Sequence, residues 1–254
     1  DYLRKKDVEV VSGILEEKCR AINKPFIKRM NSGLPWLAMK AGMSLDGKIN
    51  YQKGQSGWIT GSKSLHKVHQ LRNQFDGIMI GKGTALIDNP SLTTRLPRGG
   101  RDPHRLIIDS NLQISPSAKI FHLSSDAVTF LFCLAGVDET RKKALEEVGA
   151  RVIVVPEKQG RVDLESVLRE IVRNGMNSVL VEGGAVLHGS LLAGRFFDEA
   201  FLFQAPVFAG DQGISVVEGI TSHSKEQCIR LTSISTRKLS PDLLIHGEVS
   251  YPES

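Results

Sequence analysis

Cysteine is scarce in this chain, and the three cysteines Cys19, Cys133 and Cys228 lie far apart in the sequence. Neither a disulfide framework nor a cysteine-based zinc cluster fits this pattern, which is typical of a protein from the reducing cytoplasm. Long apolar runs are also missing, since no stretch approaches the roughly 20 residues that cross a bilayer. The polar N-terminal sequence DYLRKKDVEVV is no signal peptide. We therefore expect no membrane partner.

A strong excess of one charge is missing as well. The 254 residues carry a formal net charge of +5, and the basic residues are scattered rather than gathered in a stripe. This distribution favours small anionic ligands and no nucleic-acid partner. His66 and His69 lie three residues apart on an expected helix, but no third metal ligand follows at a suitable spacing. We therefore predict surface histidines and no metal.

From residue 36 onward, apolar strands alternate with amphipathic helices. The expected strands are 36–41, 77–80, 105–109, 128–133, 151–155, 179–181 and 199–203, and the expected helices are 64–75, 138–148, 163–174 and 185–192. This alternation predicts an α/β fold with a mostly parallel sheet and helices on both faces. The last two expected strands, 229–234 and 243–249, follow each other without a helix. They should form an antiparallel pair at the edge of the sheet.

Residues 7–31 look separate from the rest. Val8, Val10 and Val11 alternate with polar residues, as in a short strand. Apolar residues from Ile14 to Met30 then follow at helical spacing, which Pro25 interrupts. This segment is too small to be a domain of its own, so we expect it to be the tail of another part of a longer protein.

The most informative feature is a strand, turn and helix at residues 178–194. The apolar run 179–181 ends in Glu182, and Gly183 and Gly184 then open a stretch with helical apolar spacing. The first amides of a helix have no internal partner, so such a start is suited to a phosphate or pyrophosphate. An ionisable Glu182 beside an anion site predicts one ligand that reacts and one that is phosphorylated.

Two arginines are candidates for binding a phosphate. Arg72 completes the apolar stripe of the helix 64–75, where an arginine is costly unless it meets an anion. That anion could be a ligand, or equally an Asp or Glu in a partly buried salt bridge. Arg95 lies in the loop NPSLTTRLPRGGR and could be no more than an exposed charge. Together the two guanidinium groups would match the oxygens of one phosphate.

Three further signals are weaker. The segment GKGTALIDNP after the strand 77–80 is a glycine turn that matches neither the dinucleotide fingerprint nor a P-loop. Ser110 follows an acid at the end of the strand 105–109, where either a ribose contact or a simple turn is common. Lys40 lies in the apolar strand WLAMKAG and either extends outward to solvent or has a function.

Several motifs together carry a resemblance to a known family. LAMKAGMSLDGKI, SGWITG, LRNQFDGIMIGKGTALIDNPSLTTR, LIIDS and VLVEGGAVLHGSLL occur in that order over about residues 34–250. They closely resemble the reductase half of the riboflavin-biosynthesis deaminase–reductase. The resemblance implies a dihydrofolate-reductase-like fold. It also implies reduction of the ribosyl group of 5-amino-6-(5-phosphoribosylamino)uracil to ribityl, with hydride from NADPH.

The resemblance also assigns residues by position. It implies that the cofactor is contacted by Gly42, Trp58, Thr84, Asp88, Ser110 and the segment Gly184, Ala185, Val186, Leu187, His188, Gly189 and Ser190. Substrate contacts fall on Ser56, Arg72, Leu92, Arg95 and Glu182, with Lys40 near the ribose. Lys40 and Glu182 are the expected catalytic residues. Family members often carry an arginine where this chain has Gln113, so the contact with the cofactor's 2′-phosphate does not follow from the resemblance.

The resemblance further implies a domain organisation and an assembly. The usual partner domain is a zinc deaminase with H-x-E and P-C-x-x-C motifs, and neither occurs here. We therefore expect residues 1–33 to be a remnant or linker from a deaminase domain and residues 34–254 to be the reductase domain. We expect no deaminase activity and a homodimer, as is common in the family.

Two other functions remain open at this point. One is a related reductase that acts on a different pyrimidine or pterin, although the pair Arg72 and Arg95 favours a phosphorylated substrate. The other is a catalytically silent nucleotide-binding module.

Overall fold

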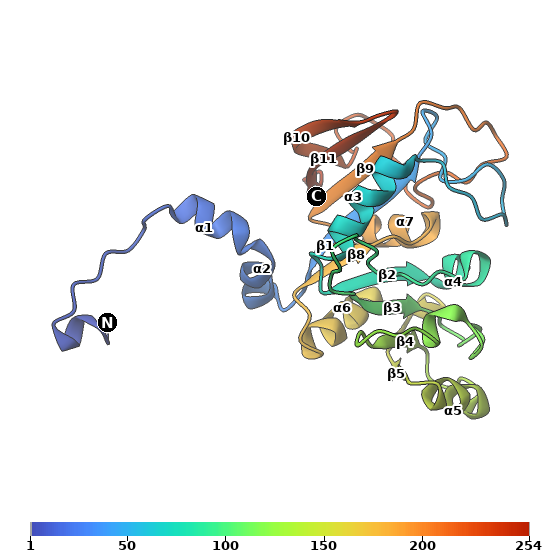
Figure 1. Ribbon diagram of the computed structural model, residues 1–254, viewed down its shortest axis with the longest axis horizontal. Helices are drawn as coiled ribbons and strands as arrows, with labels where there is room; N and C mark the ends of the chain where they lie inside the picture. Colours follow the sequence, from blue (N-terminus) through green and yellow to red (C-terminus); the bar gives the residue numbers. More distant parts are fainter. Residues whose placement is uncertain (1, 254) are drawn as a thin grey trace.

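The computed structural model describes residues 2–253, and one large sheet forms its centre (Figure 1). The strands of this sheet are β1 (Trp36–Met43), β2 (Gly77–Gly81), β3 (His104–Ile108), β4 (Thr129–Cys133), β5 (Ala150–Val154), β8 (Ser178–Val181), β9 (Glu199–Gln204), β10 (Arg230–Leu239) and β11 (Asp242–Ser250). A separate short hairpin joins β6 (Glu157–Lys158) to β7 (Arg161–Val162). All the expected strands from residue 36 onward are present, with ends that differ by one or a few residues.

The order of the nine strands is β10-β11-β9-β1-β8-β2-β3-β4-β5. The strands from β9 to β5 are parallel, whereas β11 runs antiparallel to β9 and β10 runs antiparallel to β11. This confirms the mostly parallel sheet and the antiparallel pair at its edge.

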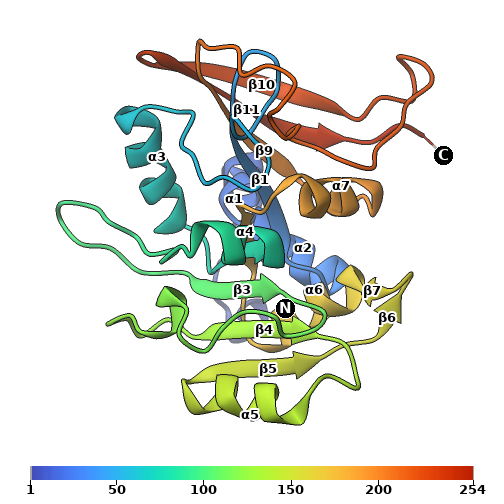
Figure 2. The same ribbon diagram turned by 90° about the vertical axis from the view of Figure 1, so that its right-hand side faces the viewer.

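Helices cover both faces of the sheet (Figures 1 and 2). They are α3 (Ser62–Arg72), α4 (Lys82–Asp88), α5 (Glu139–Glu147), α6 (Leu164–Arg173) and α7 (Ala185–Ala193). Alternate residues of the strands divide the core: Met39 and Met79 pack with α6 and α7, whereas Ala38, Ile78 and Ile80 pack with α3, α4 and α5. Sequence patterns did not predict α4, because the glycine-containing segment at its start suggested a turn.

The N-terminal segment extends away from the sheet (Figure 1). It contains α1 (Glu16–Ile22) and α2 (Lys24–Ser32). The strand expected around Val8–Val11 is wrong, since these residues have no strand partner and their backbone is irregular. Pro25 does not interrupt a helix either, because it lies in the first turn of α2, where its missing N–H costs nothing. No helix within residues 2–253 is both long and apolar enough to cross a bilayer.

The order in which the chain adds strands to the sheet reverses at β8 and β2. After β2 the chain adds β3, β4 and β5 on one side, whereas after β8 it continues with β9 and β11 on the other. In open α/β sheets, ligands bind beyond the carboxyl ends of the strands at such a switch point. The parallel register places Met39 of β1 and Met79 of β2 opposite Val181 of β8, so the residues that follow Val181 emerge between these two strands.

Candidate active site

A buried cluster of three charged residues lies at the switch point. Glu182 directly follows β8, and its backbone N–H donates to the carbonyl of Met79. Arg72, at the end of α3, donates from Nε to Glu182 Oε1 at 2.8 Å and from Nη2 to Oε2 at 2.9 Å. Lys40 of β1 places Nζ 3.4 Å from Oε2. Three elements far apart in the sequence therefore meet at one carboxylate.

The charges in this cluster stabilise each other. Burial alone would raise the pKa of Glu182, but Arg72 and Lys40 outweigh it and lower that pKa to about 2. Burial would likewise lower the pKa of Arg72, and the carboxylate of Glu182 raises it instead. Two cations and one carboxylate leave the cluster with a net positive charge. A buried site of this kind is suited to an electron-rich or anionic ligand.

The structure answers the question that the sequence left open about Arg72. The side chain is only 5% exposed, and its anion within the chain is Glu182. A third donor, Nη1, points to the carbonyl oxygen of Thr93 at 3.0 Å. Arg72 thus forms the salt bridge that was one of the two alternatives, and it also binds the loop that carries Arg95.

That loop is shaped by Leu92, which adopts a left-handed backbone conformation with φ of 55°. A bulky residue rarely takes this conformation, and such strain is concentrated at functional sites. The Leu92 side chain is 3% exposed and packs in the core beside Ile78 and Ile80, so only its backbone can face a ligand. The guanidinium-bearing residue Arg95 is exposed.

His69 connects this loop to α3, and the prediction of a surface histidine is wrong for it. The ring is 5% exposed, and Nδ1 accepts a hydrogen bond from the backbone N–H of Arg95 at 3.3 Å. Burial and the neighbouring charges of Arg72 and Arg95 lower the pKa of His69 to about 4, so the ring is neutral near pH 7. His66 on the same helix is exposed, as predicted. Residues 2–253 contain no group of three or more His, Cys, Asp or Glu placed to hold a metal ion.

The glycine turn after Glu182 is closely packed against β2. A Cβ atom on Gly183 would lie 2.6 Å from Leu187 Cδ2 and 3.3 Å from the backbone nitrogen of Gly81. Gly184 precedes α7 without any side-chain cap, and a Cβ there would lie 3.5 Å from Thr84 Oγ1. The structure therefore brings the start of α7 and the Thr84 hydroxyl together. Uncapped amides beside a hydroxyl fit the pyrophosphate of a dinucleotide.

Later residues of the predicted cofactor segment are used in packing. The ring of His188 is 2% exposed and lies 3.2 Å from the carbonyl oxygen of Val216, and burial lowers its pKa to about 4. A Cβ on Gly189 would lie 1.7 Å from the carbonyl oxygen of Glu218, so only glycine lets the loop at 218 approach the helix. Ala185 and Leu187 are buried, Val186 is 45% exposed, and Ser190 donates to the carbonyl of Val186. The backbone at the start of α7 is thus the part best suited to a ligand.

The remaining predicted residues are spread over four segments of the chain. Ser56 and Trp58 are exposed on the loop between β1 and α3, and the Trp58 side chain is 58% exposed. Gly42 of β1 faces Thr60, whose Cγ2 would lie 3.3 Å from a Cβ at that position. Asp88 is exposed at the end of α4, and Ser110 is half-buried just after β3.

The structure adds Lys82 as a further candidate, which sequence reasoning did not single out. It directly follows β2, and its Nζ donates to Oε1 of Gln113 at 2.6 Å, across to the loop that follows β3. The Lys82 ammonium is thus held by Gln113, a neutral partner that leaves its positive charge uncompensated. The available signal was its place in the sequence, immediately after a strand end.

Comparisons with known proteins agree with this architecture. A family model described as the RibD C-terminal domain matches residues 35–245. The riboflavin biosynthesis protein RibD of Bacillus amyloliquefaciens is 34% identical over 242 residues, which cover 95% of this chain and 64% of that protein. The chain therefore spans about two thirds of the length of such a relative.

Solved structures give the same result. A diaminohydroxyphosphoribosylaminopyrimidine deaminase/5-amino-6-(5-phosphoribosylamino)uracil reductase from Thermotoga maritima matches with a TM-score of 0.78 and 27% identity, over 98% of this chain and 66% of that one. The riboflavin biosynthesis reductase Rib7 of Saccharomyces cerevisiae shares the fold, with a TM-score of 0.69 and 20% identity, over 91% of this chain and 99% of that one. Since the family model covers most of the chain, the protein belongs to the RibD C-terminal domain family.

Proposed function

We propose that this protein reduces the ribosyl group of 5-amino-6-(5-phosphoribosylamino)uracil to ribityl, with NADPH as the hydride donor. The observation that carries the proposal is the buried cluster of Arg72, Glu182 and Lys40 at the switch point of the sheet. Family membership supports it, and Rib7 supports it further because that reductase consists almost entirely of the matching fold.

In this proposal Lys40 and Glu182 hold the ribosyl group. Lys40 Nζ has three N–H donors, and its approach to Glu182 occupies one of them, which leaves two for ribose hydroxyls. A carboxylate with a pKa of about 2 is a weak base. We therefore assign Glu182 the role of hydrogen-bond acceptor and charge anchor, and we assign any proton donation at the ribose to the Lys40 ammonium.

Arg95 is the proposed main ligand of the substrate 5′-phosphate. It is exposed on a loop whose position is fixed by hydrogen bonds from Arg72 to Thr93 and from Arg95 to His69. Arg72 has two N–H groups left after its contacts with Glu182 and Thr93, so it contributes to the same phosphate from the buried side. A guanidinium fork on each side would hold a phosphate firmly.

The residues present also fit a nicotinamide dinucleotide. When bound, this cofactor supplies a hydride to C1′ of the open-chain ribosyl group. The amides at the start of α7 and the Thr84 hydroxyl would hold its pyrophosphate, and the close packing of Gly183 leaves that turn free of side chains. Lys82, held by Gln113, would pair with a 2′-phosphate and so favour NADPH over NADH.

The preference for NADPH can be tested on Lys82. The variant Lys82→Ala should weaken NADPH binding by about tenfold, as expected for loss of one exposed charge-assisted hydrogen bond, and leave NADH binding unchanged. Fluorescence titration with both cofactors measures this. An equal loss for both cofactors, or none for either, would refute the role of Lys82.

Assembly and compartment belong to the same proposal: we infer a cytoplasmic homodimer. The resemblance to a family whose members are commonly dimers supports the assembly. Light scattering on purified protein measures the mass. A monomer at micromolar concentration would contradict the dimer.

The activity itself is tested by following NADPH oxidation with the aminouracil substrate, generated in situ by a separate deaminase. We expect oxidation only when both the substrate and this protein are present. Turnover of a pterin instead would favour a related reductase, and NADPH binding without turnover of either substrate would favour a silent nucleotide-binding module.

A further inference from the structure

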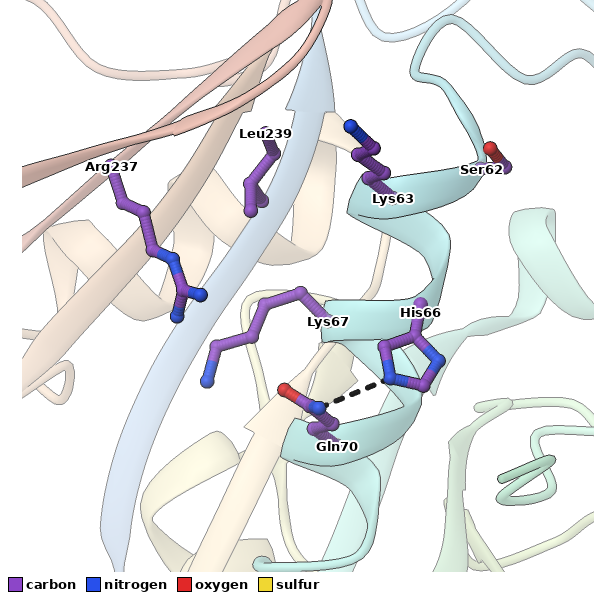
Figure 3. Close-up of a pocket in the computed structure, with 7 residues that line it drawn as sticks. All are labelled: Ser62, Lys63, His66, Lys67, Gln70, Arg237 and Leu239. Carbon is purple, nitrogen blue, oxygen red and sulfur yellow. Dashed lines mark hydrogen bonds between the residues drawn. The ribbon is translucent and has the colours of Figure 1, made fainter. Parts of the chain in front are cut away.

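A second concave site lies on the outer side of α3, against the edge strand β10 (Figure 3). It is a groove with a volume of about 300 Å³. Its lining consists of Ser62, Lys63, His66, Lys67, Gln70, Arg237 and Leu239. None of these residues belongs to the Arg72–Glu182–Lys40 cluster. On a helix with 100° per residue, Lys63 and Lys67 lie about 140–180° from Arg72, so the groove and the cluster use opposite faces of α3.

The groove contains three cations and no carboxylate. Lys63 and Lys67 come from α3, and Arg237 comes from β10. None of the three forms an ion pair with any residue in the range 2–253. The buried carboxylate of Asp242 lies near the start of α3 and adds one negative charge there, and it accepts hydrogen bonds from the Gly61 N–H and the Ser64 hydroxyl. Three cations against one nearby carboxylate leave the groove with a net positive charge within the described chain.

Lys67 and Arg237 approach each other across the groove, as Figure 3 shows. Lys67 is half-buried, and both burial and the charge of Arg237 lower its pKa. Arg237 is exposed, and two like charges this close repel each other, a cost that an anion between them would lower. The arrangement thus has the charge and shape of an anion site without its anion.

We propose that this groove binds a small phosphorylated anion between Lys67 and Arg237, with Lys63 as a third cationic contact. Arg237 offers a planar fork and the two lysines offer point charges, a combination that suits a phosphate group with two or more negative charges. Ser62 and Gln70 can add neutral donors, although Gln70 is now bonded to His66. Leu239 forms an apolar wall for an organic group attached to the phosphate.

The test compares anion binding by isothermal calorimetry in variants of equal charge. Pyrophosphate is the probe, and the groove variant is Lys67→Gln with Arg237→Gln. The matched control is Arg141→Gln with Lys143→Gln, two exposed cations of α5 that take part in no ion pair among residues 2–253 and lie far from the groove. Because the start of α7 and Arg95 are also proposed to bind phosphate groups, the readout is the number of pyrophosphate ions bound per chain. The groove variant should lose one binding event that the wild type shows, whereas the control should keep it.

The outcomes separate this site from others. Undiminished binding by the groove variant would overturn the proposal, and an equal loss in the control would show attraction to net charge only. A third variant, Arg95→Gln, should keep the groove binding, which separates it from the proposed substrate phosphate site. The measurement needs no cofactor, so its result does not depend on the proposed reductase activity. Tighter binding of phenyl phosphate than of inorganic phosphate would identify Leu239 as a contact of an organic phosphate, whereas equal binding would identify a free phosphate ligand.

Discussion

The two faces of α3 hold their cations in opposite ways. On the inner face, Arg72 is almost fully buried and forms a two-pronged ion pair with Glu182. On the outer face, Lys67 is half-buried and faces Arg237 without a carboxylate from residues 2–253. The pKa of Arg72 is therefore raised and that of Lys67 lowered, although burial acts in the same direction on both. A carboxylate partner outweighs burial at Arg72, whereas at Lys67 burial is the larger cause and the charge of Arg237 adds to it.

The comparison also separates two uses of positive charge. The inner cation orients a carboxylate that the fold needs, so its removal should affect both folding and function. The outer cations are paired with nothing in the described chain, so their removal should affect binding of a ligand and leave folding intact. Four measurements test this distinction.

The largest effect should come from Arg72→Ala. Removing one member of a buried ion pair leaves the other charge uncompensated and costs about 3–5 kcal/mol in the free energy of unfolding. Urea denaturation measures this cost. Arg20→Ala is the matched control, because Arg20 pairs with Glu16 on the exposed surface of α1, where such a pair contributes about 0–1 kcal/mol. If Arg72→Ala lowers the free energy of unfolding no more than Arg20→Ala does, the ion pair between Arg72 and Glu182 does not stabilise the fold as described.

The second effect concerns acid stability. The pKa of Glu182 is about 2 in the folded protein against 4.5 for an ordinary glutamate. Its contribution to stability is therefore complete above about pH 4.5 and is lost as the pH falls toward 2. Chemical denaturation between pH 6 and pH 3 should show a steeper loss in the wild type than in Glu182→Gln, with the exposed variant Glu146→Gln as control. Parallel curves for wild type and Glu182→Gln would show that this carboxylate is not held by the cluster.

A smaller effect is expected for Arg95, which lies on the loop bound to the inner face. Arg95→Ala should lower kcat/KM for the phosphorylated substrate by about 10- to 100-fold, because a hydrogen bond to a charged group contributes about 1.5–3 kcal/mol. The same variant should change little with the dephosphorylated substrate. Arg98→Ala, in the same exposed loop, is the control. Equal losses with both substrates would show that Arg95 does not bind the substrate phosphate.

The smallest effect should appear on the outer face. Lys67→Gln removes repulsion with Arg237 and should raise the Tm of the free protein by about 1–2 °C, which corresponds to about 0.5 kcal/mol. Lys143→Gln should leave the Tm unchanged. A lower Tm for Lys67→Gln would mean that the lysine already has a stabilising partner, and the two faces of α3 would then not differ.

The overall fold could be predicted from the sequence because each strand and helix has its own apolar pattern. The final two strands illustrate this, since the missing helix between 229–234 and 243–249 was enough to predict the antiparallel pair. The helix α4 was missed because Gly83 weakens its local pattern, and packing of Ala85 in the core compensates for that weakness. The strand expected around Val8–Val11 is absent for the opposite reason: its local pattern is clear, but no neighbouring strand pairs with it.

The site was predictable in part. The inward position of Arg72 followed from helical spacing, but no local pattern could select Glu182, 110 residues later, as its partner. His69 was misjudged because the spacing between the two histidines was compared with metal sites and not with the face of the helix. His69 lies three residues before Arg72, on the buried side, and that position was readable. The left-handed backbone of Leu92 has no sequence signal comparable to a glycine.

The contact between Gly189 and Glu218 has a consequence for how the molecule can move. The loop that holds Glu218 also accepts a hydrogen bond at Ile214 from Ile49 and donates one at Val216 to Gly47. Through Glu218 N–H it is bonded as well to Ala185 in the first turn of α7. A single irregular segment thus joins the turn after β1 to the helix start proposed to hold the cofactor. We therefore expect a ligand that moves the start of α7 to move the turn after β1 as well.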